Sequence, residues 1–292
     1  MIKDVVLSAS QIEDVRDCAA EVRRVFGVYD NVPIANDIRV LLDRNGIILC
    51  EYPFESSEKS HTDATLTRFE TGDEPLVFMG LNTSLPYDEQ IFAIAHELYH
   101  HTTRTGMSYS EEESEDPVVE KAADRFAAEL LLPQSALRRQ IMREFDSEKI
   151  GADQEQRILR FIVRLQCEWW LPYHAIVNRI YEEGHIEKDF FDRLYKVNDR
   201  DSNGAYGRLF RAIDEEKYNF LNSPTKRKGV SIAALETIIL NYEDGMVSDN
   251  EFIELLNLFE KKPEDMGFEL SVSQEDLDEL EELFGGDELD ES

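Results

Sequence analysis

The sequence predicts an α+β fold, in which a small antiparallel or mixed sheet packs on a central helix and a helical region follows. Three short runs rich in apolar and β-branched residues, at 47–52, 64–69 and 75–81, predict the strands. Nearly every other apolar segment repeats at the spacing of an amphipathic helix, most continuously over residues 155–222. The predicted strands are therefore confined to the first part of the chain.

In this first part, we expect two helices, then a strand, then a β-hairpin, then a further helix. Gly27 ends a helical pattern over residues 11–26, and a second helix precedes the turn at Asn45–Gly46. The turn-rich segment "ETGDE" joins the second and third strands and predicts a β-hairpin. Pro86 then begins a helix that runs to about Thr102, with acidic residues in its first turn, where the helix dipole favours them.

The rest of the chain is predicted to be helical, with several interruptions. A flexible acidic loop precedes a strong helix in "VVEKAADRFAAELLLP", and "QSALRRQIMREF" gives another. Breaks fall at "CEWWLPY" and "RDSNGAYG", and two short helices follow the polar junction "SPTKRKG". Residues 269–292 hold eleven Asp or Glu and no Lys or Arg, which predicts a disordered tail. Leucines at helical spacing in that tail leave open a helix that forms on binding a partner.

The net charge of −31 at pH 7 is the dominant compositional feature. Such acidity repels phosphate backbones, so a general nucleic-acid binder is not expected, whereas a basic partner or a merely solvated surface would both suit it. Cys18, Cys50 and Cys167 lie far apart without CxxC spacing, which indicates reduced thiols. The acidic start lacks the apolar run of a signal peptide, and no apolar stretch reaches membrane-spanning length. We therefore expect a soluble, cytoplasmic protein.

The stretch "AHELYHHT" places two histidines four residues apart on a predicted helix. His96 and His100 share one helical face, so both imidazoles can reach a single metal ion, and Glu97 lies beside them, where it can hold a water on that ion. The helix is apolar nearly all round and is predicted to be buried. Buried imidazole and carboxyl groups must be paired or metal-bound, which favours a metal site over residues that merely decorate a helix.

A catalytic zinc needs a third protein ligand and an open fourth position. Glu120 and Asp124, in "EKAAD", are again four residues apart on one helical face. Glu120 can ligate zinc, and Asp124 can accept a hydrogen bond from the free ring nitrogen of a ligand histidine, which fixes the tautomer of that histidine. In isolation, Glu120 and Asp124 would be interpreted as solvated helix residues. Because they follow the histidine motif by only one loop, a metal site is the better interpretation.

The stretches "DEQIFAIAHELYHHT" and "EKAADRFAAELLLP" resemble the ImmA/IrrE family of zinc-dependent metallopeptidases. The second stretch fits the family pattern at Ala123, Asp124, Phe126, Ala127, Leu130, Leu131 and Pro133. The resemblance is specific over about residues 11–140 and weaker beyond. Tyr99 stands where the family commonly has glycine, and the loop after the histidine helix is heavily acidic. Either departure would narrow specificity, and neither removes a metal ligand.

The resemblance implies a zincin-like peptidase domain in which His96, His100 and Glu120 hold Zn²⁺. Glu97 would be the general base that takes a proton from the zinc-activated water and delivers it to the leaving amine. The implied substrate is a helix-turn-helix repressor, often encoded nearby, whose cleavage switches on stress, mobile-element or prophage genes. Mn²⁺ suits the same three ligands, although the affinity order favours zinc.

We expect four parts along the chain. Residues 1–150 would form the metallopeptidase domain, 151–222 a helical, helix-turn-helix-like region, 223–268 a small helical element, and 269–292 the acidic tail. Reading DNA with the second part would require a basic face, but residues 151–190 hold five Lys or Arg against seven Asp or Glu. Direct DNA binding is therefore not expected, and packing or partner recognition is the expected role.

Two alternatives stay open. In one, the chain is a non-proteolytic binding module whose metal is structural or sensory and whose helical half captures a regulator or a toxin-like partner. In the other, which the charge disfavours, it is a DNA-binding regulator.

If the chain is a peptidase, the edge of the hairpin at 64–81 would suit pairing with an extended substrate strand. Tyr109 and His174 are the candidates for stabilising the oxyanion.

Overall fold

The computed structural model describes residues 5–29, 31–54, 63–69, 75–105 and 116–268. The chain forms two compact units, unit 1 (residues 1–233) and unit 2 (residues 234–292). The turn of the predicted hairpin, most of the acidic loop and the acidic tail lie outside the described residues. The fold is α+β, which confirms the predicted class.

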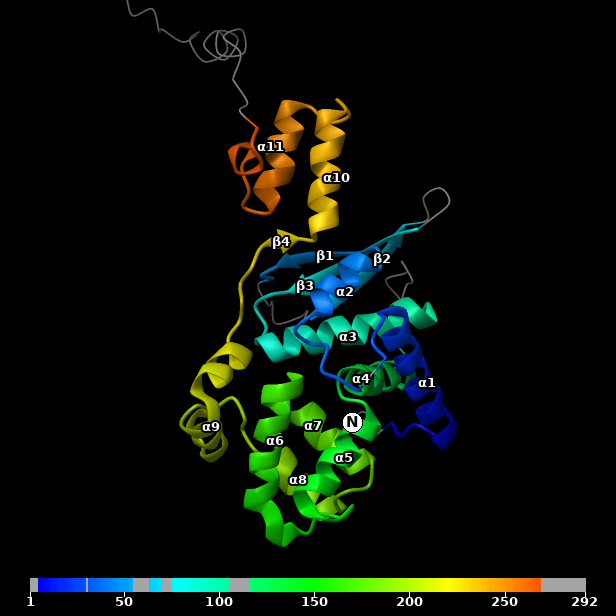
Figure 1. Ribbon diagram of the computed structural model, residues 1–292, viewed down its shortest axis with the longest axis vertical. Coiled ribbons are helices and arrows are strands. Elements are labelled where there is room, and N and C mark those ends of the chain that lie inside the picture. Colours follow the sequence, from blue (N-terminus) through cyan, green and yellow to red (C-terminus); the bar gives the residue numbers. More distant parts are fainter. Residues whose placement is uncertain (1–4, 30, 55–62, 70–74, 106–115, 269–292) are drawn as a thin grey trace, which may run out of the picture. The chain divides into compact units, whose positions relative to one another are not determined.

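Unit 1 begins with two helices, three strands and two further helices (Figure 1). They are α1 (Ala9–Val25), α2 (Ile38–Arg44), β1 (Ile47–Tyr52), β2 (Ala64–Phe69), β3 (Leu76–Asn82), α3 (Tyr87–Thr103) and α4 (Pro117–Leu131). Five helices and a short strand follow: α5 (Gln134–Phe145), α6 (Glu155–Trp169), α7 (Tyr173–Glu182), α8 (Lys188–Tyr195), α9 (Ala205–Asn222) and β4 (Gly229–Val230). The predicted strand bounds agree with β1, β2 and β3 to within a residue.

The sheet is mixed, with the strand order β2-β3-β1-β4. Strands β2 and β3 pair antiparallel, from Ala64 opposite Leu81 to Phe69 opposite Leu76, which confirms the predicted hairpin pairing. Strand β1 instead runs parallel to β3. The two-residue β4 pairs antiparallel with β1 through Val230 opposite Cys50, and the sequence did not predict it.

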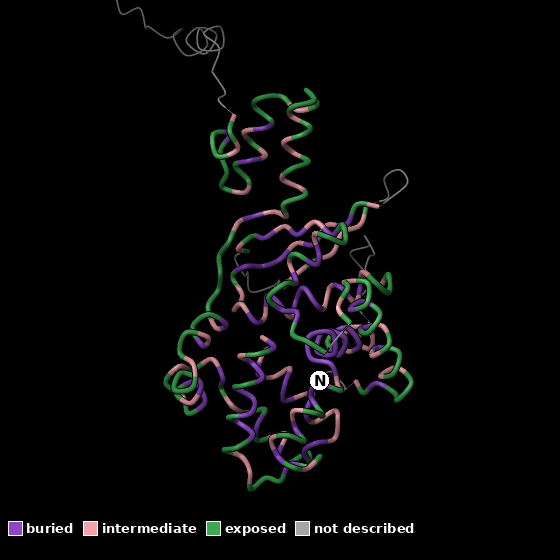
Figure 2. Tube along the Cα trace, viewed as in Figure 1, coloured by how far each residue is buried: buried purple, intermediate pink, exposed green. Residues whose placement is uncertain are grey.

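Helix α3 forms where local chemistry favours it. Pro86 caps its start, and Asp88 and Glu89 in the first turn interact favourably with the positive end of the helix dipole. Arg104, in the left-handed conformation, ends it. The sheet packs on α3, and α4 packs against α3 in turn, with α1 against α4 (Figure 1). The buried residues follow these layers (Figure 2), so α3 and α4 hold their side chains between packed neighbours.

A buried ionic network joins three of these helices in unit 1. The Glu183 carboxylate, 4% exposed, accepts from Arg16 of α1 at 2.8 Å, from Arg125 of α4 at 2.7 Å and from Arg179 of α7 at 3.1 Å. Three arginines from α1, α4 and α7 thus share one buried carboxylate. The network therefore fixes α7 against α4. The expected division of this unit at residue 150 stays a prediction.

Unit 2 is a small helical hairpin. Most of α10 (Ile232–Glu243) and all of α11 (Asp249–Leu258) lie in it, followed by a 3-10 turn, Pro263–Met266. Tyr242 stacks on Phe252 with ring centroids 4.1 Å apart, and Phe268 packs edge-on against both rings. A capping box at Ser248 begins α11. These observations confirm the two short helices expected after the polar junction.

The three cysteines are free thiols, as the sequence predicts. Across the part of the chain that the structure describes, no helix combines the length and the apolar character that crossing a membrane requires.

Candidate metal centre

The centre lies between helices α3 and α4. His96 and His100 project from one face of α3 toward α4, which contributes Glu120. The two Nε2 atoms lie 3.2 Å apart. Glu120 Oε2 lies 3.2 Å from Nε2 of His96, and Oε1 lies 3.5 Å from Nε2 of His100. These three residues form a possible metal site, with ligand atoms all within 4.8 Å of one another.

The hydrogen bonds around these atoms indicate that a cation fits there. The Nδ1 atom of His96 donates to Oδ1 of Asp124 at 3.1 Å, because a carboxylate can only accept. Nδ1 of His100 lies 3.2 Å from the Thr105 hydroxyl. When both imidazoles are neutral with their protons on Nδ1, two Nε2 lone pairs and the Glu120 carboxylate converge, and a metal ion between them would offset their repulsion. Without a metal, a proton on His96 does so, in keeping with its raised pKa.

The separations also suit zinc. Tetrahedral zinc with bonds of about 2.0–2.1 Å sets neighbouring ligand atoms about 3.4 Å apart. Two of the observed separations are close to that value: the two Nε2 atoms lie 3.2 Å apart, and Nε2 of His96 lies 3.2 Å from Oε2 of Glu120. Nε2 of His100 lies 3.5 Å from the other oxygen of that carboxylate, Oε1. The side chains of His96 and Glu120 remain 20% and 31% exposed, so water and substrate can reach the centre. A closed structural site would bury its ligands more completely.

A comparison with protein families agrees with this geometry. A family model described as Peptidase_M78, IrrE N-terminal-like domain, matches residues 42–181. Residues 42–181 belong to this peptidase family. The match runs from the end of α2 to α7, so the M78 domain contains the sheet strands β1 to β3 as well as the whole metal centre. Searches of curated proteins and of solved structures return no match for the chain.

The two clustered histidines of the M78 domain, His96 and His100, have pKa values shifted in opposite directions. Burial alone would lower the pKa of His96, but the hydrogen bond and charge of Asp124, with the charges of Glu97 and Glu120, outweigh burial and raise that pKa above its usual value. Burial, followed by the charge of His96, lowers the pKa of His100 to about 4. His100 is therefore neutral at pH 7, whereas His96 holds its proton more tightly than a free imidazole does.

Thr105 is a neighbour of the centre that sequence reasoning missed. Its hydroxyl lies 3.2 Å from Nδ1 of His100 and 2.7 Å from the hydroxyl of Thr103. It follows Arg104, the residue that ends α3. A single hydroxyl after a helix end carries no pattern, so no sequence signal marks it.

The other predicted residues lie at or near the centre. Glu97 is half-buried on α3, and its charge acts on His96. The ring of Tyr99 packs on Phe126, with centroids 5.4 Å apart, and meets the His100 ring edge-on, so it braces that ligand. His101 is not among the clustered residues, and its Nδ1 is buried with no hydrogen-bond partner among the described residues.

The structure adds no support for Tyr109 or His174 as the residue that stabilises the oxyanion. Tyr109 lies outside the described residues. His174 has both ring nitrogens near other groups: Nε2 lies 3.1 Å from the carbonyl oxygen of Tyr195, and Nδ1 lies 3.6 Å from Asp199. Its imidazole is thus held toward α8 and the segment that follows it.

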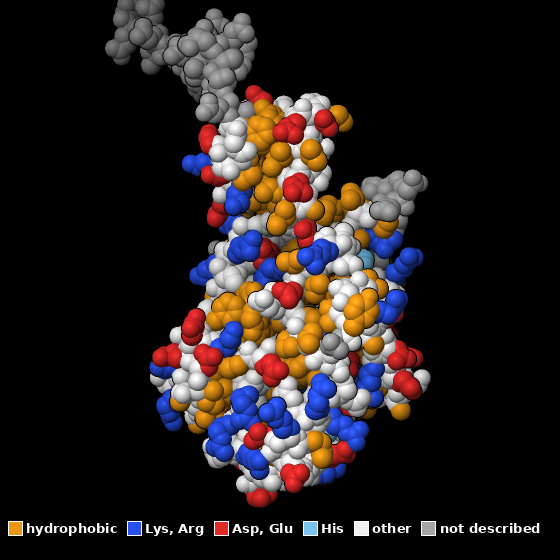
Figure 3. Space-filling model, viewed as in Figure 1, with side chains coloured by type: hydrophobic (Ala, Val, Ile, Leu, Met, Phe, Trp, Pro, Cys, Tyr) orange, Lys and Arg blue, Asp and Glu red, His pale blue; other side chains and the backbone are white. Residues whose placement is uncertain are grey.

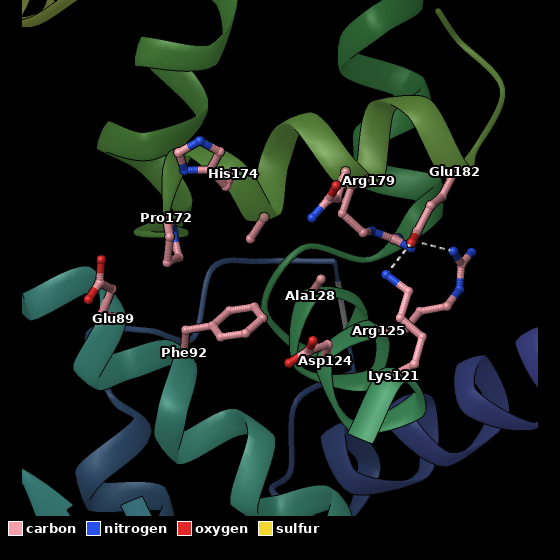
Figure 4. Close-up of a pocket in the computed structure, with 12 residues that line it drawn as sticks. Glu89, Phe92, Lys121, Asp124, Arg125, Ala128, Pro172, His174, Arg179 and Glu182 are labelled. Carbon is pink, nitrogen blue, oxygen red and sulfur yellow. Dashed lines mark hydrogen bonds and ion pairs between the residues drawn. The ribbon is translucent and has the colours of Figure 1, made fainter. Parts of the chain in front are cut away.

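A pocket of about 230 Å³ adjoins the centre in the M78 domain (Figure 4). Helices α3, α4 and α7 line it, and its lining includes Phe92, Asp124 and Pro172. Asp124 therefore belongs both to the pocket wall and to the hydrogen bond that orients His96.

Proposed function

We propose that this chain is a zinc-dependent endopeptidase of narrow specificity that cleaves a helix-turn-helix transcriptional repressor and so derepresses stress, prophage or mobile-element genes. The observation that carries the proposal is the convergence of His96, His100 and Glu120 at ligand distances within a domain of a peptidase family. A purely structural metal would not require the adjacent Glu97 or an exposed approach to the ligands.

Each residue has a role in the proposed reaction. A zinc ion bound by the three ligands supplies Lewis-acid chemistry, which acidifies water and polarises the scissile carbonyl. Glu97 takes the proton from the attacking water and passes it to the leaving amine. Asp124 and Thr105 hold the two imidazoles in the tautomers that direct Nε2 toward the centre.

The sheet offers a place for the peptide to bind. Strand β2 stands at one edge of the four-stranded sheet and pairs with β3 alone among the described strands. The sheet also packs on α3, the helix of the two histidines. An extended substrate can pair with such an edge through backbone hydrogen bonds, which gives affinity without demanding a particular sequence.

The charge supports a basic substrate such as a DNA-binding repressor, because a net charge of −31 attracts positively charged partners. The charge is not uniform over the face in Figure 3: Lys and Arg gather where α5 and α6 lie in Figure 1. The substrate is therefore expected to approach other surfaces of the chain. We place the protein in the cytoplasm, where such a repressor would be found.

The test is direct incubation of the zinc-loaded full-length chain with the repressor encoded beside it. Discrete repressor fragments are expected from the wild type and none from Glu97→Gln. A His101→Ala variant serves as the control, since His101 lies in the same motif but outside the cluster. Intact repressor under all activating conditions, or full biological activity of E97Q, would instead support a non-proteolytic binding module.

A further inference from the structure

The pocket beside the candidate metal centre is linked to it through Asp124. Asp124 lines it, and Oδ1 of Asp124 lies 3.1 Å from Nδ1 of His96, whose opposite nitrogen faces the cluster. Only the imidazole ring of His96 thus lies between the pocket wall at Asp124 and the position where the metal would bind. Consecutive Cα atoms of a peptide are about 3.8 Å apart, so a residue next to the scissile bond can reach this pocket.

Apart from side chains that already form ion pairs or hydrogen bonds, the lining of the pocket is mainly apolar. Phe92, Ala128, Pro172 and Ala175 supply apolar surface from three helices. The volume of about 230 Å³ holds several waters or one to two side chains. It lies below the range of about 300–1,000 Å³ that is usual for small-molecule sites, which argues against a separate cofactor.

Most charged groups of the lining form ion pairs within the protein, and the exception is Asp124, whose Oδ1 accepts a hydrogen bond from His96 at 3.1 Å. Glu89 pairs with Arg200 at 2.6 Å. Glu182 accepts from Arg125 at 2.6 Å and from Lys121 at 3.1 Å. Arg179 pairs with Glu129 at 2.5 Å and with Glu183 at 3.1 Å. A charged side chain in the pocket would have to give up its water without gaining an unpaired counter-charge, so an uncharged occupant is favoured.

We propose that this pocket receives an apolar side chain of the residue next to the scissile bond, of about the size of leucine, and that Ala128 and Ala175 set its depth. This inference rests on the proposed peptidase function and names a feature of its substrate. Phe92 forms the wall on the α3 side (Figure 4). Ala128 of α4 and Ala175 of α7 are the small residues of the lining.

The test uses two matched probes that bind a metal without being cleaved: succinyl hydroxamate and the same compound carrying an isobutyl group. Calorimetry on the zinc-loaded full-length chain should show the isobutyl probe binding about 50-fold more tightly, as expected for burying three CH₂ equivalents. The Ala175→Leu variant should lose most of this preference. Ala152→Leu, the same change at an exposed alanine, should retain it.

Two further readouts keep the inference falsifiable if Ala175→Leu folds poorly. Phe92→Ala should enlarge the pocket and shift the preference from an isobutyl to a benzyl group. In the wild type labelled at alanine methyls, the resonances of Ala128 and Ala175 should move with the isobutyl probe more than with the unsubstituted one.

The outcomes separate this inference from the proposed function. Equal binding of the two probes, or a preference that survives in Ala175→Leu, would overturn the pocket assignment even if the repressor is cleaved. Absence of cleavage together with an intact isobutyl preference would overturn the proposed substrate while leaving the pocket assignment standing.

Discussion

The Nδ1 atom of His96 lies 3.1 Å from Oδ1 of Asp124, which is on α4 one turn beyond Glu120. A candidate ligand on α3 is thus hydrogen bonded to a residue of α4, the helix that carries the candidate ligand Glu120. The packing of α3 on α4 therefore determines the geometry of the centre, and small shifts between these helices would change all three ligand separations.

Replacing Asp124 with alanine should weaken zinc binding by about 10- to 100-fold, because His96 loses the partner that holds its tautomer and ring orientation. Asp124→Asn should weaken it less, since the amide oxygen still accepts the hydrogen bond. Competition with a chromophoric chelator measures both. Asp153→Asn, at an exposed position, is the control, and an unchanged zinc affinity in Asp124→Ala would contradict the role given to this carboxylate.

Thr105→Val should weaken zinc binding by a smaller factor, about 3- to 10-fold, because His100 loses a neutral rather than a charged partner. Thr105→Ser keeps the hydroxyl and should restore wild-type affinity. Thr102→Val removes a hydroxyl that bonds the Leu98 carbonyl within α3, and it should leave zinc affinity unchanged. If Thr102→Val and Thr105→Val behave alike, the effect belongs to helix stability and not to His100.

Zinc affinity should fall by about tenfold for each pH unit below the pKa of His96, because one proton must leave before the metal binds. That pKa is raised, whereas the pKa of His100 is lowered to about 4, so only His96 competes above about pH 5. Asp124→Ala should move the onset of the decline to lower pH. Chelator competition across this range checks the slope, and a slope of two protons would show that both histidines are protonated.

The raised pKa of His96 weakens zinc binding at low pH, but it stabilises the metal-free protein there. Because the folded-state pKa of His96 is raised, protonation of His96 stabilises the fold. This contribution is complete below the unfolded-state pKa of about 6.5 and is lost as the pH rises through the folded-state pKa. The stabilisation that zinc adds should therefore increase with pH over this window.

Arg200→Met should destabilise unit 1 by about 3–5 kcal/mol, because it leaves the Asp88 carboxylate buried without a counter-charge. Asp88 is fully buried, and its Oδ1 accepts from Arg200 at 2.9 Å. Burial raises the pKa of Asp88 to about 6, although the charge of Arg200 opposes this shift. Burial would lower the pKa of the partly exposed Arg200, but the charges of Asp88, Glu89 and Asp199 outweigh burial and raise that pKa. The burial penalty thus falls on the carboxyl group.

Urea unfolding measures this loss. Arg211→Met breaks an exposed pair with Glu215 and should cost less than about 1 kcal/mol. The Asp88→Asn/Arg200→Met double variant should be more stable than Arg200→Met alone, since no charge is then stranded. Equal losses in Arg200→Met and Arg211→Met would contradict the account of the buried pair.

Much of this architecture is predictable because periodic patterns determine it. The apolar, β-branched run Ile47–Tyr52 is typical of a strand, and the four-residue spacing of His96 and His100 places both on one face of a helix. The link from that motif to Glu120 followed from the chemistry of zinc, which requires a third ligand. The role of each of these residues in the reaction stays a proposal.

Features that depend on tertiary packing were not predictable. Strand β4 has only two residues, too few to show alternation, and it forms because the chain returns to β1. The pocket wall combines Phe92 with Ala175, which come together because the Glu183 network fixes α7 against α4. A single alanine or threonine has no pattern in sequence, so its place beside a site follows only from the folded chain.

Metal content is the most direct test of the central claim. Elemental analysis of the full-length chain, purified in zinc-replete buffer, should find about one zinc per chain, lost in His100→Ala and retained in His101→Ala. Equal loss in both variants would indicate a general defect of α3. Absence of metal from the wild type would contradict the metal centre and, with it, the proposed peptidase function.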